Sequence, residues 1–176
     1  MITIFEGPDG SGKTTALRQL YEKENCTMKH WGLVDEPFDD YVLSVLEVRS
    51  TGIPMIYDRM HPSERAYGLG YRDEDRLELS GRSIDRLLLS LQTVQVMCLP
   101  PFEVCLENWK QRKGEEYIED VESLKRTYFA YQQYSGYLPT VLFDYTSQNA
   151  SELPERMAEI RPRTNIGPGI GTRQKG

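Results

Sequence analysis

The sequence has few residues of the kinds that build metal centres, disulfide frameworks or membrane spans. It contains 2 histidines and 3 cysteines among 176 residues, and Cys26, Cys98 and Cys105 show neither CxxC nor histidine-rich ligand spacing. We therefore expect reduced thiols, with no zinc site and no disulfide framework. No apolar run approaches the roughly 18 residues that cross a bilayer, and the N-terminus lacks a basic segment followed by an apolar one. These absences predict a cytoplasmic protein without a membrane partner.

The length suits one domain with a substantial core, and no internal repeat divides the chain. The last stretch differs in character, because residues 161 to 176 carry +4 with no acid, which leaves about −10 on residues 1 to 160. We expect a domain over 1 to 160 and a basic, glycine-containing tail over 161 to 176. The tail is interpreted either as a solvated terminus or as an arm that contacts phosphates.

Strand-like and helix-like segments alternate along the chain. The strand-like runs are residues 2 to 6, 27 to 33, 54 to 58, 94 to 99 and 140 to 145. Helical spacing covers residues 14 to 25, 39 to 50, 62 to 70, 83 to 92, 102 to 112 and 117 to 135. Since parallel strands are joined by crossover helices, the pattern predicts an α/β fold with a five-stranded parallel sheet flanked by helices.

The first strand leads into FEGPDGSGKTT, residues 5 to 15, which fits the nucleotide phosphate loop GxxxxGKT between a strand and a helix. Such glycines let backbone N–H groups surround phosphates at the positive end of a helix dipole. Lys13 would reach the β and γ phosphates, and the Thr14 hydroxyl would bind Mg²⁺. The motif predicts a P-loop NTPase fold with ATP and Mg²⁺ as cofactors. The predicted cofactor-binding residues are Gly7, Asp9, Gly10, Ser11, Gly12, Lys13, Thr14 and Thr15.

A second motif, YDRMHPSERAYG, spans residues 57 to 68 at the end of the third strand-like run. Ligands of open parallel sheets bind beyond the carboxyl ends of the strands, where Asp58 and Arg59 would lie. The chain has no NKxD segment to read guanine, which argues against a GTPase. Its length leaves little room for the machinery of a motor ATPase.

The combination of EGPDGSGKTT with DR and SERAYG resembles the thymidylate kinase family over roughly residues 1 to 145, and most closely the compact kinases of bacteriophages. The resemblance implies a nucleoside-monophosphate-kinase-like fold, transfer of phosphate from ATP to a pyrimidine deoxynucleotide, and a homodimer as one common arrangement. Carried over by position, it implies that Arg59 binds the acceptor phosphate and that Asp58 positions Mg²⁺ or the acceptor. Asp9 would lie near the acceptor sugar or its α phosphate. Ser63 and Tyr67 would contact the substrate, with the Tyr67 ring against the deoxyribose.

Two further segments match the family by position. WKQRKGEEYIED, residues 109 to 120, lies where the family has its lid, and Arg112 is the first candidate for a lid cation, with Lys110 and Lys113 behind it. In DEPFDDYV, residues 35 to 42, Asp35 or Glu36 could take a proton from an attacking hydroxyl. Both segments also fit plainer roles, as a solvated charged face and as a turn with a helix cap. Phe38 and Tyr41 could stack on a base or form part of the core.

The resemblance weakens between the two motifs. Only residues 14 to 57 separate Lys13 from Asp58, which omits the arginine-bearing helix that reads thymine in the family. Arg72, Arg76, Arg82 and Arg86 could compensate or face solvent. The gap keeps a second interpretation open, in which the acceptor is the hydroxymethyl group of 5-hydroxymethyluracil within DNA, although the acidic body argues against a nucleic-acid partner. A third is a nucleotide-binding module without turnover.

Overall fold

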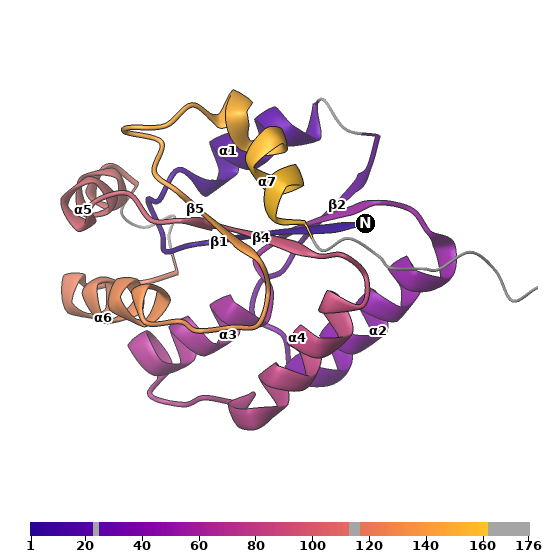
Figure 1. Cartoon of the computed structure of the whole chain (residues 1–176). Helices are drawn as coiled ribbons and strands as arrows, with labels where there is room; N and C mark the ends of the chain where they lie inside the picture. The colour runs from indigo at the N-terminus through magenta and orange to yellow at the C-terminus, as the bar shows by residue number, and fades with distance from the viewer. Residues whose placement is uncertain (23–24, 113–116, 162–176) are drawn as a thin grey trace, which may run out of the picture.

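The computed structural model describes residues 1–22, 25–112 and 117–161, and its centre is a five-stranded parallel sheet (Figure 1). The strands lie in the order β2-β3-β1-β4-β5. Their bounds are β1 (Ile2–Glu6), β2 (Thr27–His30), β3 (Met55–Asp58), β4 (Val94–Cys98) and β5 (Thr140–Phe143). β1 and β4 are buried along their whole length, as continuous apolar runs are in a sheet covered on both faces. The predicted fold class is confirmed.

Seven α-helices are present in the described residues: α1 (Lys13–Tyr21), α2 (Pro37–Thr51), α3 (His61–Tyr67), α4 (Gly81–Leu89), α5 (Phe102–Gln111), α6 (Val121–Gln132) and α7 (Leu153–Ile160). In Figure 1, α1 and α7 cover one face of the sheet, and α2, α3 and α4 cover the other. α5 and α6 lie toward the carboxyl ends of the strands. Each helical layer forms its own apolar cluster with the sheet, and Leu17, Val45 and Leu124 are representative buried members.

Several predicted boundaries were wrong. Residues 117 to 120 are not helical, because the Asp120 carboxylate accepts the Ser123 N–H at 2.8 Å and so caps α6. The helix predicted to reach residue 70 ends at Tyr67 and continues as a π-helical turn, Gly68–Arg72. Gly70 fits there because a Cβ at this position would collide with Thr127 of α6. α7 was not expected from the helical spacing of the sequence.

Three further expectations concern the cysteines, membrane-spanning helices and the basic tail. Cys26, Cys98 and Cys105 form no disulfide with one another. Among the described residues, no helix has the length and apolar character needed to span a bilayer. All of the predicted basic tail except Arg161 lies outside the described residues.

Candidate functional site

The phosphate loop connects β1 to α1 and its backbone is shaped for an anion. Gly10 and Gly12 have φ of 74° and 76°, in the left-handed region that favours glycine. A Cβ at Gly12 would lie 2.5 Å from the Tyr145 ring, and one at Gly7 would collide with the Cys98 carbonyl. Within the described residues, the N–H groups of Gly10 and Gly12 donate to no protein atom, so they are available to phosphate oxygens at the N-terminus of α1.

Lys13 and Asp58 form the charged floor of this site. The Lys13 side chain is 7% exposed, and its Nζ lies 3.5 Å from Asp58 Oδ1. Burial and the nearby Arg59 guanidinium lower the pKa of Lys13. Burial alone would raise the pKa of Asp58, but Lys13, a 2.9 Å hydrogen bond with His30 Nδ1 and Arg59 together hold it below its usual value. Asp58 is therefore a carboxylate at neutral pH.

Arg59, which follows β3, contacts β1 through its backbone and the phosphate loop through its side chain. Its φ is 70°, unusual for a residue with a side chain, and its N–H donates to the Phe5 carbonyl at 2.9 Å. The guanidinium donates to the Gly7 carbonyl at 3.1 Å and to Asp9 Oδ1 at 2.6 Å. The Tyr67 hydroxyl donates to the same Asp9 oxygen at 2.6 Å. One oxygen of the Asp9 carboxylate thus accepts hydrogen bonds from a cation and a phenol that come from two other segments.

A cavity of about 250 Å³ opens beside this cluster. Its walls come from the loop, the end of β2, α2, α3 and the turn after α3, and its lining residues are Asp9, His30, Trp31, Gly32, Leu33, Tyr41, Arg59, Ser63, Glu64, Tyr67, Arg72 and Tyr117. Glu64 is buried and accepts hydrogen bonds from both Arg72 and Arg76. Arg76 also donates to the Val34 carbonyl at 2.8 Å, which ties the turn after α3 to the segment before α2.

Glu6 is a functional candidate that the sequence analysis missed, although it stands in the quoted EGPDG. It is fully buried. Its Oε1 accepts the Met60 N–H at 2.7 Å, and its Oε2 accepts the Ser63 hydroxyl. Burial raises its pKa to about 7 despite these hydrogen bonds and the nearby Arg59. The sequence shows only an acid at the end of an apolar strand, and the burial that distinguishes Glu6 is seen in the structure.

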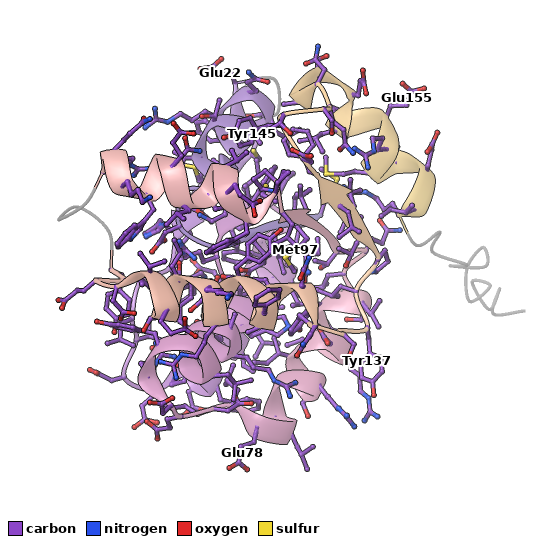
Figure 2. All side chains as sticks on the ribbon, turned by 90° about the vertical axis from the view of Figure 1, so that its left-hand side faces the viewer. Glu22, Glu78, Met97, Tyr137, Tyr145 and Glu155 are labelled. Atoms are coloured by element: carbon purple, nitrogen blue, oxygen red, sulfur yellow. The ribbon has the colours of Figure 1, made fainter. Side chains whose placement is uncertain are left out.

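A second cavity, of about 670 Å³, lies on the other side of the phosphate loop, between α1, α5 and the segment after β5. Gly10, Gly12, Thr15 and Arg112 contribute to its wall. Asn108 of α5 donates to the Gly10 carbonyl at 2.8 Å and to the Tyr145 hydroxyl at 2.7 Å. Figure 2 faces the edge at which the strands end, with Tyr145 toward α1 and Met97 nearer the centre.

The structure brings most of the predicted site residues together. The phosphate loop, Asp58, Arg59, Ser63 and Tyr67 converge on one edge of the sheet. Thr14 is exposed on the first turn of α1. Arg112 lies on the side of the second cavity, and Lys113 falls outside the described residues.

The acidic residues before α2 do not line the first cavity. Asp35 and Glu36 are exposed, and Phe38 is 38% exposed, whereas Tyr41 of the same helix lines the cavity. Of the arginines that could compensate for the missing helix, Arg72 lines the cavity and Arg82 is exposed.

These residues fit a nucleoside triphosphate with a divalent cation. Gly10, Gly12 and Thr15 line a cavity that is continuous with the free N–H groups of the loop. Asp58 Oδ1 is buried without a hydrogen-bond partner among the described residues. The described part of the chain has no cluster of three His, Cys, Asp or Glu side chains that could hold a metal alone. That suits Mg²⁺, which proteins bind through one or two ligands plus substrate phosphates and water.

Comparison with known proteins supports this description. No protein-family model matches the chain. A probable thymidylate kinase from Sulfolobus acidocaldarius is 33% identical over 89 residues, covering 48% of this chain and 46% of the relative, so the match spans about half of either protein.

Three solved structures share the fold. The YorR protein of Bacillus subtilis, in complex with phosphorylated GDP, has a TM-score of 0.70 at 20% identity and is matched over 90% of this chain and 94% of its own. A sugar kinase from Janibacter sp. has a TM-score of 0.59 at 16% identity, with 90% and 92% covered. A deoxyadenosine kinase from M. mycoides with bound dCTP has a TM-score of 0.58 at 13% identity, with 90% and 98% covered. The fold is that of P-loop kinases.

Proposed function

We propose that the protein transfers the γ-phosphoryl group of ATP to the phosphate of a pyrimidine deoxynucleoside monophosphate, as a compact kinase of the thymidylate kinase type. The observation that carries this proposal is the contact of Arg59 with both the Gly7 carbonyl and Asp9. It places a cation between the phosphate loop and a separate cavity of about 250 Å³. A protein that only senses ATP has no need of this second, cation-bearing compartment.

The donor side binds and orients the triphosphate. The free N–H groups of Gly10 and Gly12 would hold phosphate oxygens, and Lys13 would neutralise the charge that develops on the group in transfer. Thr14 and Asp58 would hold Mg²⁺, which when bound would offset the charge of the phosphates. Arg112, at the wall of the second cavity, would supply a further cation from the lid segment.

The acceptor side holds the second phosphate in line with the first. Arg59 would bind the acceptor phosphate, and its hydrogen bond to the Asp9 carboxylate keeps the guanidinium in place. Tyr67, fixed by its hydrogen bond to Asp9, would lie against the deoxyribose, where its ring would exclude a 2′-hydroxyl. Trp31 and Tyr41, whose rings meet edge to face at 5.0 Å, provide an aromatic wall for the base.

A γ-phosphate transfer assay tests the proposal. Radiolabelled ATP is offered with dTMP, dUMP, dCMP, dAMP and dGMP in parallel reactions, together with UMP to test discrimination against ribose. We expect label on a pyrimidine deoxynucleotide and little on UMP. Label only on purine acceptors would refute the pyrimidine specificity, and tight ATP binding without transfer would indicate a nucleotide-binding module.

A second candidate acceptor is the hydroxymethyl group of 5-hydroxymethyluracil within DNA. The observation that favours it is the exposure of Asp35 and Glu36, which follow the cavity-lining Leu33 closely in sequence, since an alcohol benefits from a base whereas a phosphate does not. The same assay therefore includes DNA with thymine and DNA with 5-hydroxymethyluracil. Label confined to the modified DNA would replace the first proposal with this one.

A further inference from the structure

The α3 helix begins without a cap from its own sequence. Its N-cap residue is Met60, whose side chain makes no capping hydrogen bond. The Met60 N–H donates instead to Glu6 Oε1 at 2.7 Å, and the Ser63 hydroxyl donates to Glu6 Oε2. Glu6 is 54 residues away along the chain, at the end of β1. A carboxylate from the central strand thus caps the helix that carries Ser63 and Tyr67.

The same carboxylate reaches Arg59 through one further residue. The Tyr131 hydroxyl lies 2.6 Å from Ser63 Oγ and 3.4 Å from Glu6 Oε2, and it accepts from the Arg59 guanidinium at 3.3 Å. Tyr131 is 1% exposed, so this chain of hydrogen bonds is shielded from water. Glu6 therefore touches the residue after Arg59 in sequence and is joined to its guanidinium by Tyr131.

Arg59 needs such support. Its φ of 70° lies in a region that side chains disfavour, and residues of that kind persist where their surroundings over-determine them. The Arg59 N–H is held by the Phe5 carbonyl and the next N–H is held by Glu6. Two adjacent residues of β1 thus fix the backbone from which the guanidinium extends.

We propose that Glu6 is a positioning residue that sets the orientation of Arg59 and thereby governs how the protein holds its acceptor phosphate. The role in acceptor binding rests on the proposed function, whereas the orientation of Arg59 does not. Glu6 itself lines neither of the two cavities described above. Its effect is exerted through Met60, Ser63 and Tyr131.

The charge of Glu6 adds a signature that a packing role lacks. Burial raises its pKa to about 7, so the carboxylate that accepts these hydrogen bonds forms near neutral pH. Several other ionisable groups face it from the surrounding elements, namely Lys13, Tyr41, Arg59, Cys98, Tyr131 and Tyr134. All of these groups are retained when Glu6 alone is replaced. A comparison of the wild-type protein with the Glu6 variant therefore isolates the titration of Glu6.

The test is a double-mutant cycle between Glu6→Gln and Arg59→Lys, with dTMP as the varied substrate. We expect Glu6→Gln to raise the acceptor KM about tenfold at pH 8, the effect of weakening one hydrogen bond that involves a charge, and to leave the ATP KM within twofold. In the Arg59→Lys background it should have less than a twofold effect. Below pH 6 the two proteins should converge, because protonated Glu6 resembles glutamine. The proposal would be overturned if Glu6→Gln changed the acceptor KM equally in the wild-type and Arg59→Lys backgrounds. It would also be overturned if the ratio of the acceptor KM of Glu6→Gln to that of the wild type did not depend on pH.

A spectroscopic measurement and a control variant test the role of Glu6 whichever acceptor the wild-type protein phosphorylates. The Arg59 guanidinium resonance, identified by its loss in Arg59→Lys, should shift and exchange its protons faster in Glu6→Gln and in Tyr131→Phe. Glu155→Gln, an exposed substitution on α7 (Figure 2), is the matched control and should change nothing. A wild-type protein that transfers no label refutes the proposed function, while an unaltered Arg59 resonance in both variants refutes the role of Glu6.

Discussion

Replacing Arg59 by lysine tests the junction between the two compartments of the site. The substitution keeps the positive charge but removes the planar fork that reaches Gly7, Tyr131 and Asp9 at once. The guanidinium is 15% exposed, so its hydrogen bonds are largely shielded from water. Losing one charge-assisted hydrogen bond to the acceptor phosphate costs about 2 to 3 kcal/mol. That converts to a loss of about 30-fold to 150-fold in kcat/KM for the acceptor.

The assay varies the acceptor at saturating ATP, then ATP at saturating acceptor, in a coupled ADP-release reaction. We expect the loss in the acceptor parameters and little change in the KM for ATP, since Arg59 contacts the phosphate loop through the Gly7 carbonyl and the Asp9 carboxylate and not through the backbone N–H groups that would hold the phosphates of ATP. Arg126→Lys is the matched control, because Arg126 pairs with Asp73 on the surface with 45% and 75% of their side chains exposed. An Arg59→Lys enzyme within threefold of wild type in acceptor kcat/KM would refute the reasoning.

Three further substitutions test other parts of the site. Lys13→Ala should lose nearly all phosphoryl transfer, because the buried ammonium faces Asp58 at the phosphate loop; a wild-type rate in the label-transfer assay would contradict the phosphate-loop assignment. Glu36→Gln should leave transfer to a monophosphate nearly unchanged and should slow transfer to a hydroxymethyl group strongly, which the two acceptors measured side by side would show. Glu6→Gln should also change stability, since a carboxyl whose pKa rises from 4.5 to about 7 on folding makes unfolding easier as pH increases from about 4.5 to 7. In urea unfolding, the free energy of unfolding of the Glu6→Gln variant should equal that of the wild type at pH 4.5 and exceed it by about 3 kcal/mol at pH 8. A difference between the two proteins that is the same at both pH values would refute this account.

The sequence alone determined the fold class and the donor side of the site. The alternation of apolar runs with helical segments predicted five parallel strands, because parallel connections require crossovers. The spacing of Gly7, Gly12 and Lys13 predicted the phosphate loop, because a glycine-rich turn before a helix is a local structure whose function depends on backbone shape. These features depend on residues that are close together in the chain, so they could be predicted from the sequence.

The acceptor side was decided by tertiary structure. Arg59 and Asp9 are 50 residues apart, and their contact depends on β1 and β3 being adjacent in the sheet. Glu64 is buried with Arg72 and Arg76 because a π-helical turn follows α3, which the helical pattern of residues 62 to 70 did not predict. Glu6 could not be distinguished by sequence from any strand-end acid. Its burial, its partners and its raised pKa arise only when α3 and α6 close over the end of β1.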